Sequence, residues 1–266
     1  MNILRRELKR NLRSWVIWTV SIALFVFFTL SFFPTMAKEG AKWNELMNQL
    51  PPQFSMALNL DQLNMSDLLG WFGTESYLML MLFGGIYAAM LGAGIVSKEE
   101  GDRTIEFLLA KPVSRSQIIT QKLLAGGIWI AALNAAICVC SFVGFAIFNQ
   151  GPYDQVTALH LFLASFIVQL LLFAASMLVS LFLPKAKAAT PTAIGLVLGT
   201  YFLNVMGELS QRAAWLRHLS PFRYADAAEI VQRGQAEWGY IALAIGLTLL
   251  CAALSYRVYQ RKDITA

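Results

Sequence analysis

Long apolar runs alternate with polar intervals along the whole chain. A helix needs about 20 apolar residues to cross a bilayer, and six runs approach or exceed that length, at about 15–33, 77–96, 123–148, 159–183, 190–206 and 238–256. The two longest polar intervals, 36–74 and 208–238, contain short apolar stretches typical of interfacial helices. The pattern predicts an all-α polytopic membrane protein, a single transmembrane domain over residues 1–266 with six transmembrane helices and short outer helices before the last span.

The first 14 residues follow a different pattern. They carry five Lys or Arg residues, and four apolar residues fall mostly on one side of a helix: Ile3, Leu4, Leu8 and Leu12. A basic amphipathic helix of this kind lies on an anionic membrane surface. A signal peptide is the alternative, but the apolar run that follows is long enough to span and no small-x-small cleavage pattern comes after it. We therefore expect an interfacial helix over residues 1–14.

The polar interval at residues 97–122 is highly charged and yet patterned like a helix. Ser97 can cap such a helix, with Glu100 at the position that completes a capping box. Three apolar residues then recur at i, i+3 and i+4 and form one stripe: Ile105, Leu108 and Leu109. The charged residues mostly occupy the other face. The interval predicts a short amphipathic helix with a face free for a partner; an ordinary solvated loop is the alternative.

Start and stop signals divide two of the polar intervals. Pro112 lacks an N–H group and ends the first helix of the 97–122 interval. A new start follows at Ser114, with Gln117 at the capping-box position, so the third span begins directly after the break. In the later interval, Ser220-Pro221 is a cap with a first-turn proline and Gly234 is a stop signal. These signals predict a helix over about 221–233.

The stretch from Lys98 to Arg115, KEEGDRTIEFLLAKPVSR, resembles the first cytoplasmic loop of ABC-2 type transporter permeases, the membrane subunits of bacterial ABC exporters. The resemblance extends to residues 1–14, which correspond to that family's elbow helix. It also extends to the run Ser-Pro-Phe-Arg-Tyr at 220–224, which is similar to the family's last external loop.

The resemblance implies a function for the 97–122 loop. In the family this loop carries a coupling helix that docks on a separate ATP-binding subunit. The residues then expected to contact the ATPase are Glu99, Glu100, Asp102, Arg103, Glu106 and Phe107. This chain would be the permease subunit, paired with a second copy or a related permease, and would export a substrate across the bacterial cytoplasmic membrane. ATP and Mg would be bound by the partner, and no catalytic, metal or cofactor site is expected in this chain.

The fifth apolar run contains the motif Gly195-x-x-x-Gly199. Small residues at this spacing let two helix backbones approach closely. The motif fits packing within one subunit and fits equally a contact between two copies of the chain. The dimeric arrangement that the resemblance implies favours the second reading.

Composition and charge agree with a membrane protein. The chain is 57% hydrophobic and only 14% charged, with a mean hydropathy of +0.56, which excludes a soluble globular domain. The formal charge of +5 does not indicate nucleic acid, because the basic residues are spread between the apolar runs. With the N-terminus inside, 15 of the 21 Lys and Arg residues lie on the inner side, which predicts cytoplasmic termini. Four arginines on the outer side oppose this count, but acidic residues are interspersed with them: Arg212, Arg217, Arg223 and Arg233.

Two common catalytic motifs are absent from the sequence. There is no Walker A motif, since no Gly-Lys dipeptide occurs anywhere, and there is no HExxH motif. The two histidines, His160 and His218, lie near span ends as interfacial residues do. The three cysteines sit inside apolar runs and have no metal-site spacing. ATP hydrolysis is therefore expected in a separate chain.

Polar residues are few inside the predicted spans. Glu75 and Glu208 stand at span ends, and three amides lie deeper, where each is expected to hydrogen-bond a neighbouring helix: Asn134, Gln169 and Asn204. An ion-coupled secondary transporter needs carboxylates within the membrane, and their scarcity counts against that alternative. A membrane scaffold that binds a partner and transports nothing is the remaining alternative.

Overall fold

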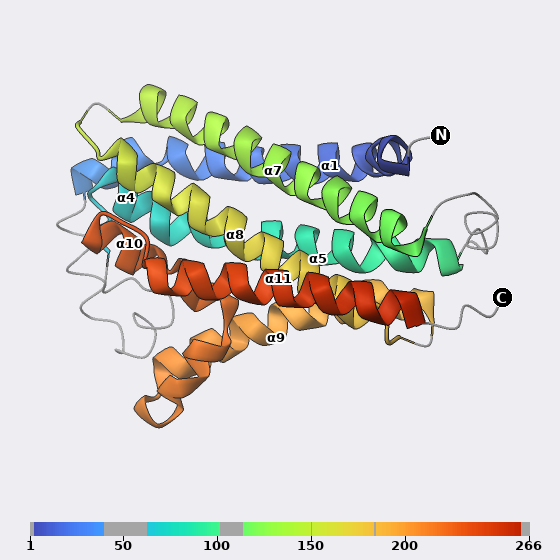
Figure 1. Ribbon diagram of the computed structural model, residues 1–266. Coiled ribbons are helices and arrows are strands. Elements are labelled where there is room, and N and C mark those ends of the chain that lie inside the picture. The colour runs from blue at the N-terminus through green and yellow to red at the C-terminus, as the bar shows by residue number, and fades with distance from the viewer. Residues whose placement is uncertain (1–2, 40–62, 102–113, 150, 184, 262–266) are drawn as a thin grey trace.

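The computed structural model describes residues 3–39, 63–101, 114–149, 151–183 and 185–261, and Figure 1 shows them as a bundle of long helices. In chain order the elements are α1 (Ile3–Ser31), α4 (Leu68–Trp71), η1 (Phe72–Tyr77), α5 (Leu78–Gly101), α7 (Arg115–Phe148), α8 (Gln155–Ser180), η2 (Ala186–Ala188), α9 (Ala189–Leu209), η3 (Gln211–Leu219), η4 (Pro221–Ala225), α10 (Ala227–Arg233) and α11 (Trp238–Arg261). No strand occurs in these ranges, and six helices are long and apolar enough to cross a membrane, so the predicted fold class is confirmed.

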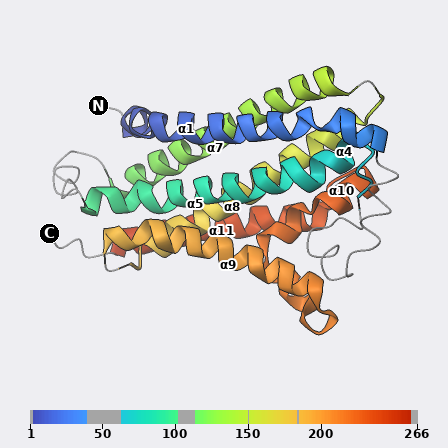
Figure 2. The ribbon, with the colours of Figure 1, turned by 180° about the vertical axis from the view of Figure 1, so that it is seen from behind.

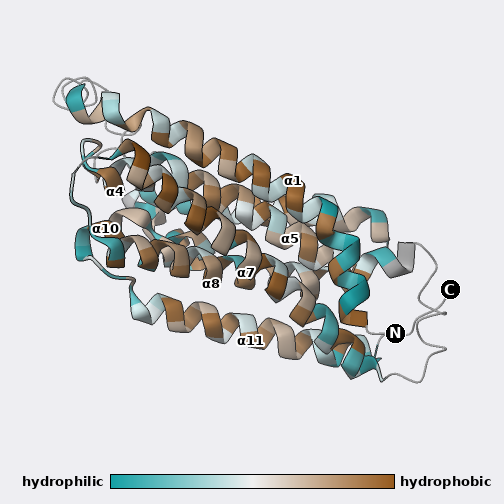
Figure 3. Cartoon of the chain, turned by 90° about the horizontal axis from the view of Figure 1, so that it is seen from above, coloured by the Kyte–Doolittle hydropathy of each residue, from teal (hydrophilic) through white to brown (hydrophobic). Residues whose placement is uncertain are grey.

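The two ends of the bundle differ in what they carry. The start of α1 and the end of α11 lie at one end, together with the end of α5 and the start of α7 (Figures 1 and 2). We call this the loop end. The short elements η3, η4 and α10 lie at the opposite end, the far end. Hydrophobic residues are concentrated between the two ends, and hydrophilic residues gather at the ends themselves (Figure 3). This arrangement is that of a membrane-spanning bundle with both termini on one side.

The first turns of α1 run across the direction of the rest of that helix (Figures 1 and 3). Helical hydrogen bonding nevertheless continues from Ile3 to Ser31, so the two predicted segments form one bent helix. The buried line on its first turns consists of Ile3, Glu7 and Asn11, whereas Leu12 of the predicted apolar set is 46% exposed. These two polar residues are buried because they have partners on α5 and α7, as described below.

The centre of the bundle is built on α5. Most of the apolar part of α5 is buried, whereas most of α9 and α11 is not. Small residues on α5 let α8 approach closely: a Cβ at Gly92 would lie 2.2 Å from the carbonyl oxygen of Phe173. Such an approach is possible only for glycine, since a main-chain atom cannot move aside as a flexible side chain does.

The substitution Gly92→Ala is therefore expected to destabilise the protein by about 1–3 kcal/mol, the usual cost of overpacking a filled interior. The matched control is Gly127→Ala on α7, where a Cβ would have no described atom within 4 Å. Thermal unfolding of the purified protein measures both. Equal midpoints for the two variants would contradict the close α5–α8 contact.

The one helix predicted over 221–233 is divided into two short elements at the far end, η4 and α10. Ser220 caps η4 as expected, accepting a hydrogen bond from the Phe222 amide at 3.2 Å. The chain then leaves helical geometry at Asp226, whose side chain caps the separate helix α10. Gly234 ends α10 in a left-handed conformation with φ of 70°, as its stop signal predicts. The helix breaks at Asp226 because an aspartate side chain readily accepts hydrogen bonds from the unpaired backbone amides at the start of a helix.

Candidate functional site

The third span begins where the sequence predicts. Ser114 accepts a hydrogen bond from the Gln117 amide at 3.2 Å, and the Gln117 side chain accepts one from the Ser114 amide at 3.1 Å. This reciprocal pair is the predicted capping box, and it fixes the start of α7.

The predicted cap at Ser97 is wrong. Ser97 lies inside α5, and its hydroxyl donates to the Ala93 carbonyl one turn back at 2.7 Å. Serine makes this bond readily inside a helix, so the residue does not have to act as a cap. The backbone of Glu99 and Glu100 consequently belongs to the last turn of α5 and not to a separate helix. A force applied to these two residues acts directly on a membrane-spanning helix.

The other residues predicted to contact the ATPase lie outside the described residues: Asp102, Arg103, Glu106 and Phe107. The described elements on either side of them are α5, which ends at Gly101, and α7, which begins at Arg115.

A buried lysine joins α7 to both neighbouring helices at the loop end. The Lys122 side chain is fully buried, and its Nζ lies 3.3 Å from Oε1 of Glu7 in α1. The same Nζ donates to the Ile95 carbonyl in α5 at 2.5 Å. One ammonium group thus contacts α1 and α5 while belonging to α7. The Glu7 side chain is only 1% exposed, so the ion pair is shielded from solvent.

Further polar side chains surround this ion pair. Arg10 donates to both carboxylate oxygens of Glu7, at 3.0 and 2.9 Å. The Asn11 amide donates to Glu7, and its oxygen accepts from Lys98 Nζ at 3.4 Å. We call this set the polar cluster: Glu7, Arg10, Asn11, Lys98 and Lys122. It connects the start of α1 to the two helices that flank residues 102–113.

The polar cluster was missed by the sequence analysis. Glu7 and Lys122 are 115 positions apart, and no local pattern relates residues at that separation. One signal was available: Glu7 is the sole acidic residue among the first 14, and it stands on the same helical line as Ile3 and Asn11. An isolated acid in a basic segment indicates a specific partner, because it otherwise weakens the attraction to an anionic surface.

Two of the three deep amides behave as predicted. Asn134 in α7 donates to Gln169 in α8 at 2.8 Å, and Ser165 donates to Asn134 at 2.9 Å. Gln169 also reaches the Leu80 carbonyl of α5 at 3.4 Å. Asn204 is different, because it donates to Glu208 within its own helix, so the prediction of an interhelical bond is wrong there.

The glycine motif of α9 faces away from the rest of the described chain. A Cβ at Gly195 or Gly199 would meet no described atom within 4 Å. The same helix face continues at i+7 and i+11 with Phe202 and Met206, which are 58% and 54% exposed. We call these four residues the α9 stripe. Packing against the described residues does not account for this stripe.

These observations describe a bundle of six candidate spans with a bent N-terminal helix, a buried polar cluster beside the end of α5 and the start of α7, and an open glycine stripe. A comparison with protein families gives the class: the family described as ABC-2 family transporter protein matches residues 1–264, and the chain belongs to this family. No curated protein matches the chain. The chain is therefore a multi-pass membrane permease component of ABC transporters, a transport subunit and not itself the catalytic one.

Proposed function

We propose that this chain is the permease of an exporter in which a separate ATPase engages the loop at residues 97–122. The polar cluster then passes the movement of the loop to α1, α5 and α7 together. The observation that carries the proposal is the position of Lys122, which contacts Glu7 of α1 and the main chain of α5 at one buried point. ATP and Mg belong to the partner chain, whose movement reaches this one through Glu99, Glu100 and the residues that follow.

The ion pair favours joint movement of the three helix ends. Separating Lys122 from Glu7 would leave both charges in a buried site with fewer compensating contacts, and breaking a buried pair costs about 3–5 kcal/mol. Sliding of α7 past α1 therefore costs more than moving the two helices as a unit. The bent start of α1 would act as a clamp over the helices on either side of the coupling loop.

Two copies of the chain, or this chain and a related permease, would meet along the α9 stripe. The open glycines allow close approach of a second helix, and the exposed aromatic and methionine side chains supply apolar contact area. Alternating access along this interface would move the substrate. The excess of basic residues at the loop end supports a cytoplasmic position for both termini in a bacterial cell membrane.

The direct test is to purify the tagged protein from its native membrane and identify what accompanies it. We expect a Walker-motif ATPase with the native chain and its loss when Glu99, Glu100 and Asp102 are changed to lysine together. The matched control is Glu237→Lys at the far end, where an exposed Arg233–Glu237 pair at 3.2 Å contributes little. A partner that stays with the triple variant, or a protein that purifies alone, would show that the loop is not the docking site.

The same purified protein distinguishes an exporter from a secondary transporter and from a membrane scaffold. A secondary transporter would be active in liposomes under an ion gradient without ATP. A scaffold would retain the partner, but its ATPase activity would not respond to any transported substrate. Deleting residues 105–109 should leave membrane insertion intact and uncouple ATP hydrolysis from transport.

A further inference from the structure

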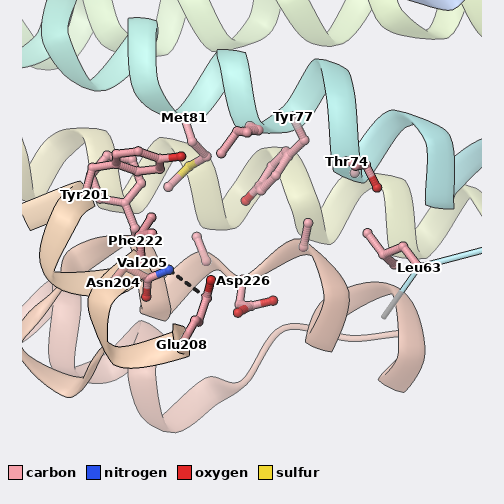
Figure 4. A pocket seen from close by; sticks show the side chains of 14 residues that line it. Leu63, Thr74, Tyr77, Met81, Tyr201, Asn204, Val205, Glu208, Phe222 and Asp226 are labelled. Carbon is pink, nitrogen blue, oxygen red and sulfur yellow. Dashed lines mark hydrogen bonds between the residues drawn. The ribbon is translucent and has the colours of Figure 1, made fainter. Parts of the chain in front are cut away.

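A small cavity lies at the far end, between η1 and α5 on one side and α9 and η4 on the other (Figure 4). Its volume is about 60 Å³. Five polar side chains among its lining residues matter for what it could hold: Tyr77, Tyr201, Asn204, Glu208 and Asp226. The coupling proposal above makes no use of this site.

The charges around the cavity do not balance. The Glu208 and Asp226 side chains are each 4% exposed, and Arg217 contacts both, at 3.3 and 3.2 Å. Arg223 contacts Asp226 at 3.2 Å and also pairs with Glu229. Three carboxylates thus face two guanidinium groups, which leaves one excess negative charge in this network of five described residues when all are ionised. Glu229 is 23% exposed and so reaches solvent, whereas Glu208 and Asp226 are 4% exposed, so an unbalanced charge on those two carboxylates requires a counter-charge.

Both arginines count as full positive charges in this balance. Burial opposes the charged form of Arg223, but the hydrogen bond and charge of Glu229 outweigh it and raise the pKa of Arg223. Arginine is in any case effectively always protonated in proteins. Both guanidinium groups are therefore charged, and the count of one excess negative charge already includes them.

Two acceptor atoms at the cavity have no hydrogen-bond partner within the described chain. They are the hydroxyl oxygen of Tyr77, a residue 2% exposed, and Oδ1 of Asn204, a residue 9% exposed. The Asn204 amide nitrogen is already used, because it donates to Glu208 at 2.8 Å. Figure 4 shows the Tyr77 hydroxyl turned toward the same space as the Glu208 carboxylate. Buried polar atoms are normally satisfied, so such a group of acceptors indicates a donor outside the described residues.

We propose that this cavity binds a primary ammonium group. An ammonium group supplies one positive charge and three N–H donors, which match the excess charge and the acceptors on Glu208, Asn204 and Tyr77. The volume suits such a group, since one water occupies about 30 Å³ of liquid. A calcium ion would need six or more oxygen ligands, more than these residues offer. The group can come from a free amine or from the ethanolamine head of a lipid.

The test is calorimetric titration of methylammonium chloride into the full-length protein in nanodiscs of phosphatidylglycerol and phosphatidylcholine. We expect saturable binding that Glu208→Gln weakens about ten-fold or more, because the charged acceptor is lost. Tyr77→Phe should weaken binding less and leave the fold intact, since its hydroxyl has no partner to lose in the described chain. The control Glu237→Gln should bind as the native protein does. Tetramethylammonium, which has no N–H donor, should not bind.

A second set of nanodiscs containing phosphatidylethanolamine identifies the source of the group. Weaker methylammonium binding there means that the lipid head group occupies the cavity, and unchanged binding means that a free amine does. Absence of saturable binding in the first nanodiscs, or equal binding by native protein, Glu208→Gln and Tyr77→Phe, would overturn the proposal. So would an infrared carboxylic-acid band that disappears in Glu208→Gln and persists at saturating methylammonium, because a proton would then supply the counter-charge. The assay contains no ATPase, so its failure leaves the coupling proposal standing.

Discussion

Replacing Glu7 with leucine is expected to destabilise the folded protein by about 3–5 kcal/mol, the cost of breaking a buried ion pair from one side. The substitution takes away the carboxylate that lies 3.3 Å from Lys122, whose side chain is fully buried. It also removes the acceptor of the two Arg10 hydrogen bonds. Thermal or denaturant unfolding of the purified protein in detergent measures the loss.

Arg10→Met is the matched control for this change. Arg10 binds the same carboxylate, but its side chain is 23% exposed and the pair spans one turn of a single helix. Discounting for solvent screening, its loss should cost less than about 1 kcal/mol. If Arg10→Met lowers the free energy of unfolding as much as Glu7→Leu does, the stability comes from the contact within α1 and not from the contact between α1 and α7.

The double variant Glu7→Leu with Lys122→Met separates stability from coupling. Replacing both members of a buried pair by apolar residues of similar size is often neutral or stabilising, so most of the lost stability should return. The connection between α1, α5 and α7 should not return, because the bond from Lys122 to the Ile95 carbonyl is also gone. We therefore expect the double variant to form a stable complex with the partner ATPase but to stimulate its ATP hydrolysis less than the native permease does. If the double variant stimulates ATP hydrolysis as the native permease does, the coupling does not pass through this ion pair.

The sequence predicts what depends on local pattern. Runs of apolar residues long enough to span a membrane identify all six long helices, and the Ser114–Gln117 capping box places the start of α7. Residues 98–115 identify the family, and the family match over residues 1–264 confirms it. These features depend on residues that are close together in the sequence, so local pattern is enough to find them.

The errors and omissions have tertiary causes. Ser97 carries a capping signal, but the helix before it continues and its hydroxyl bonds within that helix. Glu7 is buried by a residue 115 positions away, so an acid that looks like part of a solvated face belongs to the interior. The sequence also does not show which neighbouring helix a small residue packs against. Gly92 lies against the main chain of α8, whereas Gly199 has no described atom within reach.

Gly199→Leu is expected to leave the protomer folded and to weaken association of two permease copies. A Cβ there would meet no described atom within 4 Å, so the free energy of unfolding should change by less than about 0.5 kcal/mol, as at ordinary surface positions. Between two copies the added side chain would keep the helices apart and remove the close backbone contact that glycine allows. We expect the dissociation constant to rise about ten-fold or more, equivalent to about 1.4 kcal/mol. Energy transfer between differently labelled copies in liposomes, measured at increasing dilution, gives this constant.

Gly246→Leu on α11 is the control that makes this test specific. Gly246 is also free of described neighbours within 4 Å, and α11 is as poorly buried as α9. Both leucines add the same apolar side chain to an open helix face, so any general effect on insertion or lipid contact is shared. If only Gly199→Leu weakens association, the α9 stripe is the meeting surface. If Gly246→Leu weakens it and Gly199→Leu does not, the copies meet through α11, and the α9 stripe faces lipid.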